Sequence, residues 1–291
     1  MIDLEAELVD LDGFETLDRE LYAPTIAELT RLTRMIENEF DPPQWVVKDS
    51  RKQWVYRSTG REYIVIQRLF RGISALNACR FLIPNCFVAE MGVLLRTINE
   101  FEEDIVFLLE NYPEEQSEDQ KTFIQENLKP MYRNRDIPFE GLESPAMVPR
   151  KKVVAATRRR VASLSNPHDA QKLASITGDL FSAYVHGAFE ANMDLYGFDG
   201  QVQSYQVSGL RSDRARFDWI QQLLLQLERQ VFAVEYVGQI LGPVNVHQEA
   251  GALRKWYAEA ANKFGYYQEF ENKNPLADLK AGRALRAKRP S

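Results

Sequence analysis

An arginine and a glutamate interrupt an otherwise apolar stretch, and their spacing could serve chemistry. Arg96 and Glu100 are four residues apart, so they are neighbours on one face of a helix. Burying a guanidinium costs several kcal/mol unless a partner satisfies it. Arg96 therefore either pairs with Glu100 inside the protein or binds an anionic ligand such as a phosphate.

A second apolar stretch carries a hydroxyl, a carboxylate and an imidazole. Ser182, His186 and Glu190 follow one another at four-residue steps and share a helix face, whereas Tyr184 points elsewhere. A histidine between such groups could act as an acid or base near neutral pH. The alternative is a core histidine that forms hydrogen bonds between helices.

Basic residues gather in two other places, although the chain has a formal net charge of −6. One segment, 150–160, begins with an arginine and two lysines and ends with three arginines, and the segment 280–291 has basic residues without an acidic one. Both are either solvated faces or contacts for nucleic acid. Arg158 and Arg159 belong to the first segment.

The elements that must position these residues are helices. Apolar residues recur at three- and four-residue steps, and we predict helices over 23–40, 61–83, 86–111, 114–132, 166–196, 211–241 and 246–264. Pro84 separates the second from the third. Only 45–56 and 202–207 suggest strands. We therefore predict an all-α fold, a multi-helix bundle with a central buried helix pair and at most a minor hairpin.

The domain organisation follows from charge and proline content. We predict an acidic N-terminal segment at 1–22, one helical domain at 23–270 and a basic tail at 271–291. The stretch 136–149 contains three prolines and is the candidate point of subdivision.

Several function classes lack their signatures. The two cysteines, Cys79 and Cys86, are read as buried thiols of a reducing compartment, and no zinc-binding or other metal-binding pattern is present. No phosphate-binding glycine loop or dinucleotide motif occurs, so we predict no cofactor. With neither a signal peptide nor a transmembrane stretch, we expect a cytoplasmic protein without membrane contact.

Two short motifs carry a resemblance. The pattern L-L-R-x-x-x-E at 94–100 with S-x-Y-V-H-G at 182–187 resembles a family of uncharacterised bacterial helical proteins, known as a domain of unknown function; the match covers about 64–109 and 173–196. This resemblance implies an all-helical core in which Arg96, Glu100, Ser182, Tyr184 and His186 converge.

A looser similarity is to the HEPN superfamily of helical RNases and nucleotide-binding proteins, common in bacterial toxin and antiphage systems. Those enzymes carry R-x(4–6)-H on one helix. Here Arg160 and His168 are separated by seven residues that include Pro167, so Arg96 and His186 would have to act from separate helices.

Two functions follow. The first is a non-catalytic interaction protein (a sensor, adaptor or assembly subunit, in a bacterial defence or stress system), with a buried Arg/Glu/His/Tyr network and a protein partner or a second copy bound. The alternative is a metal-independent RNase or nucleotide-acting effector. Its catalytic residues would be Arg96, Glu100, Tyr184 and His186, and its substrate-binding residues Ser182, Glu190, Arg158 and Arg159.

Overall fold

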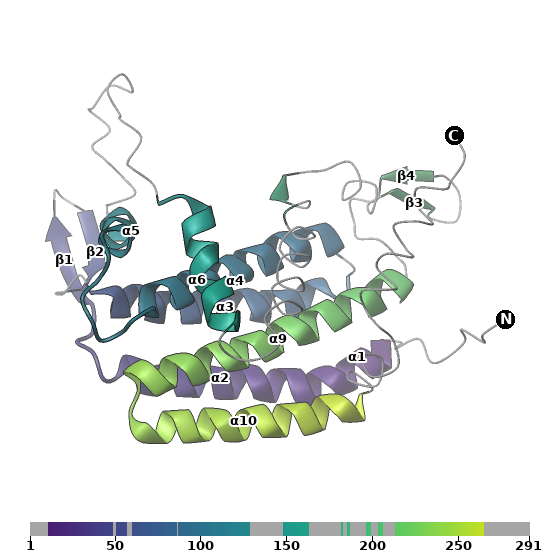
Figure 1. The fold of residues 1–291 in the computed structure, drawn as a ribbon. Coiled ribbons are helices and arrows are strands. Elements are labelled where there is room, and N and C mark those ends of the chain that lie inside the picture. Colours follow the sequence, from purple (N-terminus) through teal and green to yellow (C-terminus); the bar gives the residue numbers. More distant parts are fainter. Residues whose placement is uncertain are drawn as a thin grey trace.

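The computed structural model describes residues 11–48, 51–56, 60–85, 87–128, 148–162, 182, 185–186, 196–198, 203–205 and 213–264. Within them, packed helices make up almost all of the regular structure, with two small hairpins beside them (Figure 1). The predicted all-α bundle is confirmed. No helix in this part of the chain is both long and apolar enough to cross a bilayer.

Helices α3 (Arg61–Leu82) and α4 (Val88–Leu109) form the predicted central pair and pack closely on each other. A long helix, α9 (Asp213–Leu241), crosses the bundle and contacts this pair on one side. On its other side α9 packs on α2 (Ala23–Glu37) and α10 (Val244–Lys263), as Figure 1 shows. The centre of the fold is therefore three helices, α3, α4 and α9.

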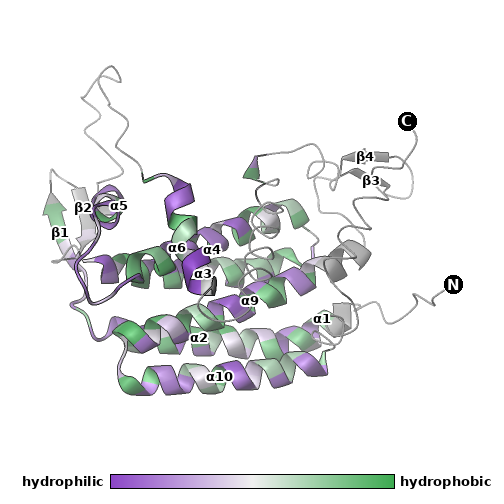
Figure 2. Ribbon diagram, viewed as in Figure 1, coloured by the Kyte–Doolittle hydropathy of each residue, from purple (hydrophilic) through white to green (hydrophobic). Residues whose placement is uncertain are grey.

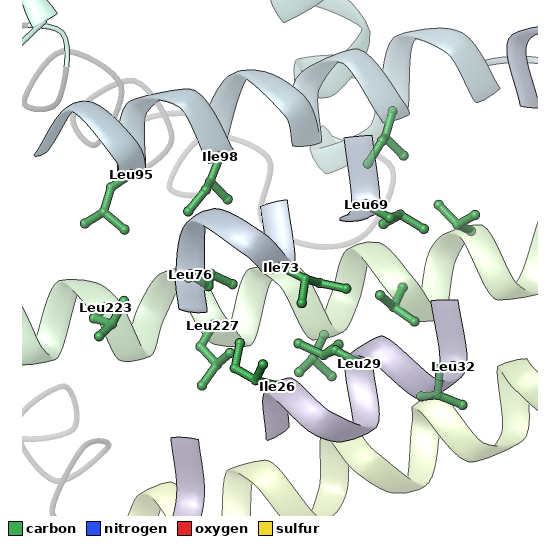
Figure 3. Packing of buried hydrophobic residues seen from close by; sticks show 14 of the residues in the cluster. Ile26, Leu29, Leu32, Leu69, Ile73, Leu76, Leu95, Ile98, Leu223 and Leu227 are labelled. Atoms are coloured by element: carbon green, nitrogen blue, oxygen red, sulfur yellow. The ribbon is translucent and has the colours of Figure 1, made fainter. Parts of the chain in front are cut away.

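The interior is built mainly from leucine and isoleucine. Side chains of α2, α3, α4 and α9 point into a common space (Figure 3), and the labelled members are Ile26, Leu29, Leu32, Leu69, Ile73, Leu76, Leu95, Ile98, Leu223 and Leu227. Their three- and four-residue spacing gives each helix one apolar face. Figure 2 shows the matching mixture of apolar and polar residues along α2 and α10.

Proline separates α3 from α4, as predicted. Helix α3 ends at Leu82, and the N–H of Ile83 still donates to the carbonyl of Cys79 at 3.0 Å. Pro84 has no N–H to continue the ladder, and the N–H of Phe87 donates to Leu82 instead, at 3.2 Å. The two helices can therefore fold back on each other.

The N-terminal segment differs from its prediction as a separate acidic stretch. Helix α1 (Leu11–Leu17) and a π-helical turn, η1 (Asp18–Tyr22), lead directly into α2. Four of their side chains are buried in the core: Phe14, Leu17, Leu21 and Tyr22. The hydroxyl of Tyr22 donates to the Leu76 carbonyl at 2.7 Å. The helical body therefore extends back at least to Phe14.

Two shorter helices lie against α4. Helix α5 (Glu118–Leu128) begins after a reciprocal cap, in which the Gln120 N–H donates to Ser117 Oγ at 3.2 Å and the Ser117 N–H donates to Gln120 Oε1 at 2.8 Å. Helix α6 (Arg150–Ala162) follows. Most of the candidate boundary at 136–149, and most of the predicted helix at 166–196, lie outside the described residues.

The stretch 45–56, which suggested a strand, lies in a hairpin, and 202–207 supplies one strand of a second hairpin whose other strand precedes it. Strands β1 (Gln44–Lys48) and β2 (Arg51–Val55) are antiparallel, with Trp45 opposite Trp54. Strands β3 (Tyr196–Phe198) and β4 (Gln203–Tyr205) form the second, smaller hairpin. In Figure 1 the β1–β2 hairpin stands at one end of the bundle.

Candidate functional site

Arg96 and Glu100 form the predicted ion pair on α4. Their Nη2 and Oε1 atoms are 2.9 Å apart, and the side chains are 18% and 41% exposed, respectively. Arg96 is thus mostly buried and already neutralised by its own helix. An incoming phosphate would have to share this guanidinium with Glu100.

His186 occupies a different setting from the one its motif suggested. Its N–H donates to the carbonyl of Ser182 at 3.1 Å, so the two residues share one helical turn. Ser182 is half-buried, but His186 is exposed, which removes it from any buried network. The described contacts do not join His186 to Arg96. Tyr184 and Glu190, the other candidates of this segment, lie outside the described residues.

A larger ionic network begins two residues beyond Glu100. Glu102 is buried and faces α9, where Arg229 Nη2 lies 2.6 Å from its Oε2 and Gln226 Nε2 donates to its Oε1 at 2.5 Å. Burial raises the pKa of Glu102 to about 7, although Arg229 and Gln226 oppose the shift. This carboxyl group therefore joins α4 to α9 and titrates near neutrality.

The next two carboxylates of α4 face α3 and α6. Arg68 Nε of α3 donates to Asp104 Oδ2 at 3.0 Å, and Arg150 of α6 donates to the other oxygen of Asp104 and to Glu103. Arg150 also donates to the carbonyl of Glu100, at 2.9 Å. One guanidinium thus bridges three residues of α4, which fixes α6 across the helix.

Four further cations of α6, Lys152, Arg158, Arg159 and Arg160, also have partners. Lys152 Nζ lies 2.8 Å from Asp119 of α5, and Arg159 makes two hydrogen bonds to Glu110, at 2.6 and 2.8 Å. The Arg160 guanidinium lies 4.8 Å from the centre of the Tyr236 ring, and Arg158 is also engaged. The basic segment 150–160 therefore holds helices together, and its ion pairs do not support the predicted nucleic-acid contact. The second basic segment, 280–291, lies outside the described residues.

This arrangement is suited to positioning helices. Each buried carboxylate of the network has at least one arginine partner, and no group of histidine, cysteine, aspartate and glutamate side chains among the described residues fits a metal ion. Burial also raises the pKa of the Cys79 thiol to about 12, which makes it a poor nucleophile.

A small hollow of about 220 Å³ lies where α1 and η1 meet the end of α3. It is smaller than a typical ligand pocket. Its one guanidinium, Arg80, already makes two hydrogen bonds of 2.6 Å to Asp18. We therefore do not treat this hollow as a binding site.

The most exposed large aromatic side chains of the β1–β2 hairpin form a second candidate site. Trp45 and Trp54 are 51% and 65% exposed, and Val47 beside them is 66% exposed. The two indole rings meet edge to face, with centroids 4.9 Å apart and an interplanar angle of 62°. We call Trp45, Val47 and Trp54 the tryptophan face. The sequence of this stretch, with W-V-V and Q-W-V, predicted strands but did not mark the tryptophans as a candidate site.

No family model, no curated protein and no solved structure matched the chain. The resemblances drawn from the motifs at 94–100 and 182–187 therefore stay predictions.

Proposed function

We propose that this chain is a non-catalytic interaction protein, in which a helical body held by ion pairs presents the tryptophan face to a macromolecular partner. The roles of sensor, adaptor and assembly subunit all fit this proposal, as does a place in a bacterial defence or stress system.

The charged residues of the body support the non-catalytic part. Glu102, Glu103 and Asp104 form ion pairs with arginines from α3, α6 and α9. These carboxylates therefore join α4 to its neighbouring helices. A catalytic carboxylate or guanidinium must instead be free to meet a substrate. Arg96, the candidate phosphate-binding residue, is engaged by Glu100.

The observation that carries the proposal is the exposure of Trp45 and Trp54. Tryptophan is the side chain that most often dominates the energy of a binding interface. Two of them stand in contact with each other on a hairpin at the end of the bundle, each at least half exposed (Figure 1). Burial of this large apolar area by a partner would contribute favourable free energy to binding.

Site-specific photocrosslinking tests this proposal. A photoreactive amino acid replaces Trp45 in one variant and Lys255, an exposed residue of α10, in the control. In cells that express the chain, we expect adducts from position 45, weakened by the added change Trp54→Ala, and none from position 255. Equal labelling at both positions, or none at either, would contradict the proposal.

The alternative, an RNase that uses Arg96 and His186, has its own test. Cleavage of total RNA by the purified protein, abolished by Arg96→Ala and by His186→Ala at unchanged melting temperatures, would replace our proposal with this one. No contact among the described residues favours it: Arg96 is paired, and His186 is exposed elsewhere.

A further inference from the structure

We infer that the β1–β2 hairpin is a binding site for single-stranded nucleic acid, with unpaired bases stacked on Trp45 and Trp54 and phosphates held by the cations of the same strands. This inference rests on the proposed function, because it names the class of partner that the tryptophan face would bind.

The geometry of the tryptophan pair leaves room for a base. In an edge-to-face pair, the ring that offers its edge keeps both of its faces clear of its partner. Trp54 is 65% exposed and Trp45 is 51% exposed, so solvent reaches both indoles. An unpaired base offers a flat ring of similar size, and stacking on an aromatic side chain contributes about 1–3 kcal/mol per base.

The charge of the hairpin is opposite to that of the chain. Residues 44–55 contain three cations, Lys48, Arg51 and Lys52, against one carboxylate, Asp49, a formal charge of +2, whereas the chain as a whole has a net charge of −6. Local positive charge beside exposed indoles calls for a ligand that is both anionic and aromatic. Single-stranded nucleic acid has both properties in every nucleotide.

The register places cations and tryptophans at neighbouring positions. Trp45 pairs with Trp54, Val47 with Lys52, and Lys48 with Arg51. Because alternate residues of a strand lie on the same side, positions 52 and 54 belong to one face of the hairpin. Lys48 and Arg51 form the last pair, at the turn end. By this register all three cationic positions lie between the tryptophan pair and the turn, with position 52 on the tryptophan face. A nucleotide chain stacked on the indoles would thus have positive charge on its turn side.

The size of the hairpin favours a nucleotide chain over a protein. Two strands of five residues span only about 17 Å, whereas a stable protein interface covers roughly 800 Å² on each partner. Lysine is also depleted in protein interfaces, yet two of the three cations here are lysines. A few stacked nucleotides need no larger platform.

The test is fluorescence anisotropy of labelled oligothymidine and oligouridine, each about 12 nucleotides long, titrated with the full chain at low salt. We expect both single strands to bind, and a labelled duplex of the same length to bind more weakly. Trp54→Ala should weaken binding about tenfold and Trp54→Phe much less, since a phenyl ring still stacks. The matched control is Trp256→Ala, which removes a partly exposed tryptophan from α10 and should leave binding unchanged.

Salt dependence tests the cations separately. One to three phosphate contacts predict a slope between about −0.7 and about −2 in a plot of log affinity against log salt, and Lys52→Glu should make this slope shallower. Circular dichroism melts show whether each variant keeps the helical body.

Three outcomes would overturn the inference: no binding of either oligonucleotide, binding that Trp54→Ala and Trp256→Ala reduce equally, or binding only to vesicles of equal parts phosphatidylcholine and phosphatidylserine. If the position-45 adducts of the crosslinking experiment are destroyed by protease and resist nuclease, the interaction function stands and this inference falls. If position 45 gives no adduct at all, the proposed function falls with it.

Discussion

Glu102 is a buried carboxyl group that titrates near neutral pH. Its pKa rises from 4.5 to about 7, chiefly through burial. The folded state therefore holds this proton more tightly than the unfolded chain does. The contribution of Glu102 to stability is therefore largest at or below pH 4.5 and falls as the pH rises to 7, by at most about 3 kcal/mol.

Glu102→Gln should remove this pH dependence, because the amide cannot ionise. Relative to the wild type, the variant should gain stability between pH 5 and pH 8, as measured by urea unfolding at a series of pH values. Glu100→Gln removes a more exposed carboxylate from the same helix and serves as the control. Parallel pH profiles for the wild type and Glu102→Gln would show that the buried carboxyl group is not the cause.

Sequence spacing predicts some residue-level contacts and not others. The Arg96–Glu100 pair follows from a four-residue step on one helix. The contact of Glu102 with Gln226 spans 124 positions and depends on how α4 crosses α9. No local pattern encodes that crossing, so Glu102 was indistinguishable from a solvated glutamate in the sequence.

At the scale of elements, Arg150 is the main ionic attachment of α6. It serves Glu103, Asp104 and the carbonyl of Glu100, and its loss would leave Glu103 without its partner and Asp104 with only Arg68. We expect Arg150→Ala to lower the free energy of unfolding by about 3 kcal/mol.

Lys151→Ala is the matched control for Arg150→Ala, because Lys151 is the exposed neighbour on the same helix. It should change the urea midpoint little. Arg150→Lys should restore only part of the loss, since an ammonium cannot reproduce the fork of a guanidinium. Similar midpoints for Arg150→Ala and Lys151→Ala would mean that α6 is held by its apolar face alone.

The close approach of α9 and α10 depends on a glycine. A Cβ atom at Gly238 would lie 2.8 Å from Cγ1 of Val246, which is fully buried and cannot move aside. Gly238→Ala should therefore destabilise the protein by about 1–3 kcal/mol. At Gly251, on the same helix pair, the nearest atom would be Glu235 Oε1 at 3.4 Å. Gly251→Ala should instead stabilise by up to about 1 kcal/mol, and thermal melts would reveal opposite signs.

Element boundaries were the most predictable level, because proline and glycine mark them locally. Pro84 separates α3 from α4, and Gly242 with Pro243 separates α9 from α10. The sequence also predicted the basic character of α6, but not which groups its arginines bind. Arginines that hold neighbouring helices and arginines that hold phosphates look alike until the partner helices are placed.

At the scale of the whole molecule, the N-terminal segment closes one side of the bundle. Its acidic residues led us to predict a segment separate from the helical domain, but the apolar residues between them, Phe14, Leu17 and Leu21, recur at three- and four-residue steps and are buried. Tyr22 adds a hydrogen bond to α3, and η1 also contacts α10. The segment thus fastens the first helix of the bundle to its last.

A chain that begins at Ala23 should therefore lose much of its stability, because the faces of α3 and α10 under this segment would be exposed to water. We expect its melting temperature, followed by circular dichroism, to fall by many degrees or its transition to lose cooperativity. In the full chain, Leu21→Ala should cost about 3 kcal/mol, whereas Glu20→Ala, at a side chain that is 56% exposed, should cost little. If the truncated chain has the same melting temperature as the full chain, the stable helical domain begins at residue 23, as first predicted. In that case the buried side chains of residues 14–22 would contribute packing without contributing stability.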